Sequence, residues 1–145
     1  MLFGVYDAGA RRLTVANAGA PYPLLVRNGN IEEIRVGGIP LGLFVDSEYE
    51  ISSIDLLPGD VVIIASDGIL ESINAEKEEF GSERLVNVLQ SLPPQGSAES
   101  VSDAILYATD QFTGFSASPH DDRTLLVLRV TDAPTADFSK LPVIY

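Results

Sequence analysis

Near its middle the chain reads Val61-Val62-Ile63-Ile64-Ala65-Ser66-Asp67-Gly68, an apolar run that ends in an acidic turn. The run begins with consecutive β-branched residues, which are typical of a central strand buried on both faces. The turn residues Pro58-Gly59-Asp60 precede it. We therefore predict a central strand over 61–64, with Asp67 and Gly68 at its carboxyl end.

Short strands separated by turn residues precede this run. The predicted strands cover 2–6, 13–17, 22–27, 31–36 and, after a loop at 37–42, 49–54. Asn28-Gly29 is a strong hairpin signal because both turn positions tolerate positive φ. We interpret the first third of the chain as a β-meander, in which each strand pairs with the next.

Two amphipathic helices are predicted after the central strand. The first has apolar residues at helical spacing from Leu85 to Leu92, with Ser82 as its expected N-cap and Pro93-Pro94 as its end. The second has an apolar stripe from Val101 to Phe112, with Ser97 as its expected N-cap. We interpret both stripes as core faces that cover a sheet.

A last strand is predicted over 124–130, directly after Asp121-Asp122. If it pairs antiparallel with the central strand, Asp67 and Asp121 converge at one edge of the sheet. Converging carboxylates repel each other, and a hard divalent cation such as Mg²⁺ or Mn²⁺ suits ligands that are all oxygen. The residues alone leave another interpretation open, in which Asp67-Gly68 is an ordinary turn and Asp121-Asp122 an exposed loop.

Composition excludes several classes of function. The 145 residues are 46% hydrophobic and 21% charged, as in a globular domain, and they include no cysteine to form disulfides or thiolate sites. The net charge of −12 disfavours nucleic acid and anionic lipid as partners. No apolar run approaches the ~20 residues of a membrane span, and Met1–Gly4 lacks the layout of a signal peptide. We expect a cytoplasmic protein.

Six short motifs occur in order: Asn17-Ala18-Gly19, Gly38-Ile39-Pro40-Leu41-Gly42, Leu57-Pro58-Gly59-Asp60, Ser66-Asp67-Gly68-Ile69-Leu70-Glu71, Phe80-Gly81-Ser82-Glu83-Arg84-Leu85 and Asp121-Asp122-Arg123-Thr124. Together they resemble the SpoIIE/RsbU-like branch of the metal-dependent (PPM) serine/threonine protein phosphatases, a family of bacterial signalling enzymes. The resemblance implies an α+β fold in which antiparallel β-sheets have helices packed outside, as part of an α-β-β-α sandwich. It covers 1–130 and leaves 131–145 as a tail or linker.

The same resemblance implies a metal centre and a reaction. Asp67 and Asp121 match metal ligands of the family, and Gly68 and Asp122 occupy supporting positions beside them. The intact domain is expected to hold two Mn²⁺ or Mg²⁺ ions, which activate the water that hydrolyses phosphoserine or phosphothreonine. No catalytic residue independent of the metals and no phosphate-binding residue is identified. The implied substrate is a phosphorylated protein, such as an anti-sigma-factor antagonist.

The chain departs from the family pattern in two ways. Relatives often have His after Asn-Ala-Gly, where this chain has Ala20. The acidic motif and the Gly-His-Gly-type segment of the family's N-terminal half have no match here. We therefore expect the C-terminal portion of a larger phosphatase domain, inactive in isolation.

Two alternatives remain from the sequence. One is a non-catalytic interaction module, or pseudophosphatase, that pairs with a partner or forms a homo-oligomer through exposed sheet edges. The other is an acidic, β-rich binding domain unrelated to phosphatases, in which Asp67 and Asp121 are ordinary loop residues.

Overall fold

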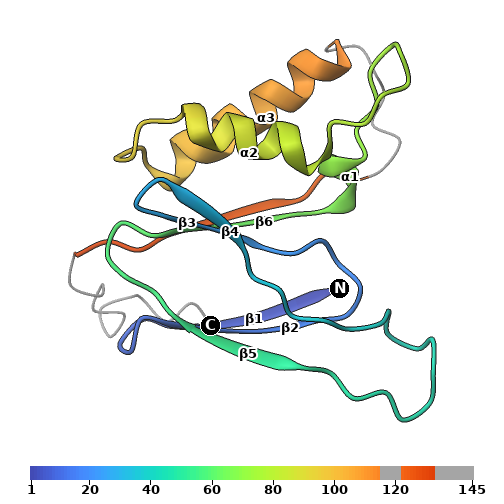
Figure 1. The fold of residues 1–145 in the computed structure, drawn as a ribbon, viewed down its shortest axis with the longest axis vertical. Coiled ribbons are helices and arrows are strands. Elements are labelled where there is room, and N and C mark those ends of the chain that lie inside the picture. Colours follow the sequence, from blue (N-terminus) through green and yellow to red (C-terminus); the bar gives the residue numbers. More distant parts are fainter. Residues whose placement is uncertain (115–121, 133–145) are drawn as a thin grey trace, which may run out of the picture.

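The computed structural model describes residues 1–114 and 122–132, which form two antiparallel sheets and three helices (Figure 1). The elements are β1 (Leu2–Asp7), β2 (Arg12–Asn17), β3 (Leu24–Arg27), β4 (Asn30–Glu33), β5 (Ile51–Asp55), β6 (Val61–Ala65), α1 (Asp67–Leu70), α2 (Gly81–Ser91), α3 (Ala98–Thr113) and β7 (Leu125–Arg129). None of the described helices is both long enough and apolar enough to cross a membrane.

The four-stranded sheet has the order β4-β3-β6-β7, and the three-stranded sheet has the order β1-β2-β5. Strand β6 therefore lies inside its sheet, between β3 and β7, and four of its five residues are buried. Its pairing with β7 runs antiparallel from Val61 opposite Arg129 to Ala65 opposite Leu125. The predicted central strand is confirmed.

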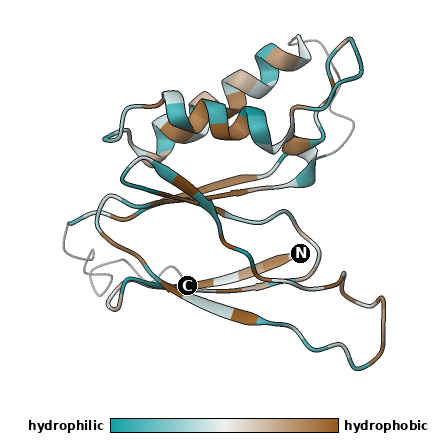
Figure 2. Cartoon of the chain, viewed as in Figure 1, coloured by the Kyte–Doolittle hydropathy of each residue, from teal (hydrophilic) through white to brown (hydrophobic). Residues whose placement is uncertain are grey.

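Three layers stack on one another, as Figure 1 shows: α2 and α3, then the four-stranded sheet, then the three-stranded sheet. Alternate residues of β6 serve both interfaces, because successive side chains of a strand point to opposite faces. Val61, Ile63 and Ala65 pack with the helices, whereas Val62 packs between the sheets. Figure 2 shows the resulting apolar band along β6 and β7. The expected α+β class, with antiparallel sheets and helices packed outside, is confirmed.

The predicted β-meander is wrong, because β2 and β3 belong to different sheets. The buried Asn17 ends β2 by accepting the Ala20 N–H and donating to the Ala20 carbonyl, at 2.8 and 2.9 Å. Gly19 turns the chain with φ +79°. Pro21 and Pro23 lack the N–H that a strand ladder needs. The chain therefore crosses to the second sheet instead of turning back beside β2.

The hairpin predicted at Asn28-Gly29 is confirmed. Strands β3 and β4 pair with Arg27 opposite Asn30, and the two turn residues have φ of 51° and 80°. The returning strand is shorter than the predicted 31–36. It ends at Glu33, beyond which Ile34 and Val36 leave the sheet and pack between the two sheets.

Both long helices are confirmed, but the N-cap predicted for the first is wrong. Helix α2 begins at Gly81 after Phe80, because the buried Phe80 ring packs edge-on against Phe112, with 5.6 Å between ring centroids. At α3 the predicted cap is correct: the Ser97 hydroxyl accepts the Ser100 N–H at 3.0 Å.

A buried carboxylate closes the turn into β6. Asp60, predicted only as a turn residue, has a side chain 3% exposed and pairs with Arg27 at 2.6 Å. It also accepts the Leu57 N–H at 2.7 Å. Asp55, in contrast, is exposed, and its hydrogen bond from Arg12 lowers the pKa of the carboxyl. Asp60 thus anchors the turn from which β6 begins.

Candidate functional site

The site begins where β6 ends, at Ser66. The Ser66 N–H donates to the Thr124 carbonyl at 2.9 Å, and its Oγ accepts the Thr124 N–H at 2.9 Å. The same hydroxyl donates to the Asp122 carbonyl at 3.3 Å. One serine therefore extends the β6–β7 ladder and holds the segment before β7 against the end of β6.

Asp67 follows as the first residue of the one-turn helix α1. The turn forms because the Ile69 and Leu70 N–H groups donate to the Ser66 carbonyl, and the Glu71 N–H donates to the Asp67 carbonyl at 2.7 Å. Ile69 is fully buried in the core beneath the helices, which fixes the turn's orientation. Asp67 is left exposed, as a carboxylate held at the end of a rigid strand.

Gly68 lies directly against the segment that precedes β7. A Cβ at Gly68 would lie 3.0 Å from the Asp122 carbonyl carbon and closer still to its oxygen. Neither backbone segment can move without breaking the Ser66 hydrogen bonds. Glycine at 68 is therefore required for the acidic segments to approach each other.

The predicted site residues have different outcomes. The antiparallel pairing of β6 and β7 brings Asp67 and Gly68 beside Asp122, whose side chain is exposed. Asp121 lies outside the described residues. Within 1–114 and 122–132, no group of three or more acidic or histidine side chains is arranged to hold a metal ion. The described residues thus offer oxygen donors that suit a hard cation, but only part of a coordination shell.

Within residues 1–114 and 122–132, no arginine or lysine forms an ion pair with Asp67. Arg123, which sits between Asp122 and β7, donates from Nη1 to Asp110 Oδ1 of α3 at 2.7 Å. The Asp110 carboxylate therefore balances the charge of Arg123. The carboxylate at 67 stays available for an external positive group.

A cavity of about 570 Å³ opens beside Asp67, between the two sheets. Apolar residues of β1, β6 and β7 form most of its wall, and Ser66, Asp67 and Thr124 lie at its rim. Ala20 also lines it, at the position where relatives often carry histidine. The sequence patterns identify Asp67 and the alanine at position 20 separately. They do not show that the two share one cavity, because the crossing from β2 to β3 was interpreted as a simple turn.

Two separate motifs also meet at the Asn17 turn. A Cβ at Gly38 would lie 2.9 Å from the Asn17 carbonyl carbon, and one at Gly19 would lie 2.9 Å from the Pro40 ring. The Asn-Ala-Gly turn and the Gly-Ile-Pro loop therefore pack backbone to backbone. This close approach explains why Gly19 and Gly38 carry no side chain.

Comparison with known proteins identifies relatives for this arrangement. The family model of Stage II sporulation protein E (SpoIIE) matches residues 1–131. Stage II sporulation protein E of Bacillus subtilis (strain 168) is 24% identical over 143 residues, 98% of this chain and 16% of that protein. Phosphoserine phosphatase RsbU of the same strain is 25% identical over 133 residues, 89% of this chain and 38% of RsbU.

A solved structure is similar as well. The phosphatase domain of the cell fate determinant SpoIIE from Bacillus subtilis, presoaked with Mn, matches with a TM-score of 0.70 and 16% identity. The match covers 92% of this chain and 57% of that one, and it shows a shared fold. The chain thus spans less than two thirds of each of these relatives.

Replacing Gly68 with alanine tests the close approach to Asp122. We expect Gly68→Ala to lower the free energy of unfolding by about 1–3 kcal/mol, the usual cost of an overpacked position. Gly37→Ala is the matched control, because a Cβ there would meet only the Glu50 side chain at 3.8 Å. Urea unfolding followed by circular dichroism measures both. Equal stability of the two variants would show that Gly68 is not constrained.

Proposed function

This chain belongs to the SpoIIE/RsbU-like branch of the PPM phosphatase family, and we propose that it supplies part of the metal centre of a protein serine/threonine phosphatase. The observation behind the proposal is the position of Asp67. Asp67 is exposed just beyond the end of β6 and lines the inter-sheet cavity, and its neighbour Gly68 lies against the backbone of Asp122. An ordinary turn residue is also exposed, but it needs neither this close backbone approach nor a place on a cavity wall.

In this proposal Asp67 and Asp121 hold Mn²⁺ or Mg²⁺, as the family resemblance implies. Ions of this kind neutralise phosphate charge and lower the pKa of bound water. The chain's own residues do the positioning: Ser66 joins the two strand ends, Gly68 permits their approach, and Ile69 anchors the turn. The metals also overcome the repulsion that a chain of net charge −12 would exert on a phosphoprotein.

The proposed substrate is a phosphorylated signalling protein, such as an anti-sigma-factor antagonist. The name of one relative, phosphoserine phosphatase RsbU, supports phosphoserine as the residue whose phosphate ester is hydrolysed. The proposal places the reaction in the cytoplasm. Disulfides do not persist in that reducing compartment, and this chain has no cysteine that could form one.

We further propose that residues 1–130 complete a four-layer sandwich only together with another part of a phosphatase domain. Within the described residues no helix covers the outer face of the three-stranded sheet. Phe3, Val5 and Ile51, on strands of that sheet, are 61%, 52% and 69% exposed. By the β1–β2–β5 register, all three lie on its outer face. Such an apolar face needs a cover, and a second helical layer is the one expected from the α-β-β-α arrangement.

Activity assays test the proposed function directly. We expect residues 1–145 alone to hydrolyse p-nitrophenyl phosphate with Mn²⁺ at the background rate, because most of the coordination shell is missing. In a longer protein that carries the preceding half-domain, Asp67→Asn should reduce Mn²⁺-dependent activity by at least about a hundredfold, since even outer-shell changes cost ten- to a hundredfold.

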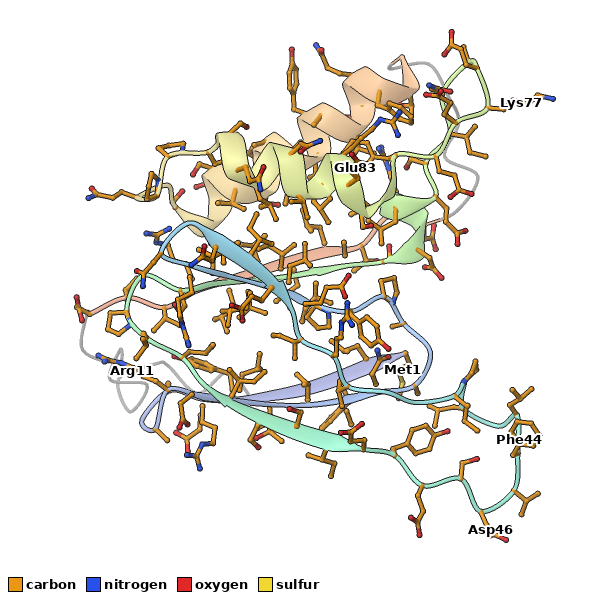
Figure 3. All side chains as sticks on the ribbon, in the orientation of Figure 1. Met1, Arg11, Phe44, Asp46, Lys77 and Glu83 are labelled. Atoms are coloured by element: carbon orange, nitrogen blue, oxygen red, sulfur yellow. The ribbon has the colours of Figure 1, made fainter. Side chains whose placement is uncertain are left out.

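The control for that assay is Asp46→Asn, the same chemical change on the β4–β5 loop. Figure 3 shows Asp46 well separated from α1. Full activity of Asp67→Asn, or an equal loss in Asp46→Asn, would rule out Asp67 as a metal ligand. Robust hydrolysis by residues 1–145 alone would instead overturn the half-domain proposal.

A second candidate function is a non-catalytic module that pairs with a copy of itself. Among the described residues β1 and β7 are edge strands of their sheets, and these edges and the apolar outer face favour it. We expect light scattering to give a mass above that of the monomer at high concentration. The double substitution of Phe3 and Val5 by serine should lower this mass, whereas Leu43→Ser, at an exposed loop residue, should not. A monomeric mass for the unmodified chain would exclude self-pairing.

A further inference from the structure

A second cavity, of about 460 Å³, lies at the other end of β6. Val61, the first residue of β6, lines it, whereas Asp67 lies two residues beyond the strand's last residue, Ala65. At the usual rise per residue the strand separates the two places by roughly 13 Å. The β3–β4 hairpin, the end of α2, the α2–α3 connection, the first turn of α3, Gly59 and the end of β7 form the remaining walls. In Figure 1 that connection and α1 lie at opposite ends of the sheet. This cavity is therefore distinct from the candidate metal site.

Arg129 makes the cavity chemically unusual. The other six arginines of the described residues each lie within 4.0 Å of a carboxylate oxygen. Arg129, the last residue of β7, lines the cavity wall and donates from Nη2 to the Pro94 carbonyl at 2.8 Å. A guanidinium has five N–H donors in a planar fork that matches a carboxylate. Within the part of the chain that the structure describes, this fork has no anionic partner.

The cavity wall lacks negative charge in a chain that is otherwise rich in it. Acidic residues number 21 against nine basic ones, yet no described residue that lines this cavity is acidic. Most of the wall is apolar, with Val26, Leu89, Leu92, Pro93 and Val101 among its residues. A carboxylate elsewhere on the surface would meet repulsion, but here it would meet a single positive charge next to apolar walls.

We propose that this cavity binds a small amphipathic monocarboxylate, with its head group on Arg129 and its apolar body against Leu89, Leu92 and Val101. The volume lies within the range of ligand pockets in proteins, about 300–1,000 Å³. One guanidinium balances one carboxylate charge, whereas a phosphate dianion would add an unbalanced charge to an already acidic chain. The ligand would bridge the α2–α3 connection and the sheet, without touching the residues of the candidate metal site.

Titration of residues 1–145 with octanoate, followed by amide shifts in NMR spectra, tests this proposal independently of phosphatase activity. We expect saturable shifts at Gly29, Gln90 and Gln95, which line the cavity. The uncharged analogue 1-octanol should bind at least tenfold more weakly, because it forms no charge-assisted bond. Arg129→Gln should weaken octanoate binding by about ten- to a hundredfold, whereas Arg35→Gln, at an exposed arginine paired with Glu33, should leave it unchanged.

Several outcomes would overturn the proposal. Octanoate could fail to saturate, or its shifts could fall on Phe3 and Val5 of the open β1 face instead of the cavity. Equal affinity for octanoate and 1-octanol would also exclude a carboxylate site. This last comparison uses the unmodified chain, so it decides the question even where Arg129→Gln fails to fold. Unchanged octanoate affinity in a folded Arg129→Gln variant is equally decisive.

Discussion

The antiparallel pairing of β6 with β7 is the constraint on which the other features of this molecule depend. Because the two strands run in opposite directions, the end of β6 lies beside the beginning of β7. At one end this places the Asp67-Gly68 turn beside Asp122, with Gly68 in close approach. The Ser66 hydroxyl joins the two strand ends by hydrogen bonds to Asp122 and Thr124. At the other end the pairing places Val61 opposite Arg129. Asp60 and Arg27 hold the strand's start, so both ends of β6 are fixed.

Local patterns in the sequence predicted most elements, because the periodicity of buried residues is set within each element. The β-branched run, the Asn28-Gly29 hairpin and the two helical stripes were correct for this reason. The β-meander was wrong because the Asn17 turn and the prolines after it carry the chain to the other sheet, where β3 pairs with β6, a strand distant in sequence. The start of α2 was wrong because packing of Phe80 against Phe112 outweighed the capping preference of Ser82.

The candidate site shows the same division between local and distant information. The convergence of Asp67 with the residues before β7 followed from an assumption about strand pairing that the structure shows to hold. Three features could not be predicted from local patterns. These are the one-turn helix at Asp67, the close approach at Gly68, and the cavity that Ala20 shares with Asp67. The approach at Gly68 and the shared cavity depend on backbone segments that are far apart in sequence, and the one-turn helix is oriented by the burial of Ile69 in the core. The family match covers residues 1–131, which are only part of the relatives' length, and the role of Asp67 remains a proposal.

The central claim is that Asp67 and the acidic pair before β7 act on one cation. A double-mutant cycle of Mn²⁺ affinity tests it most directly, measured by calorimetry on this chain together with the half-domain proposed to complete the sandwich. The cycle compares Asp67→Asn, Asp121→Asn and the two combined. We predict that each change weakens binding and that the effects are coupled by roughly 0.5–3 kcal/mol, as for residues in contact. Additive effects, or unchanged affinity in either single variant, would contradict the claim.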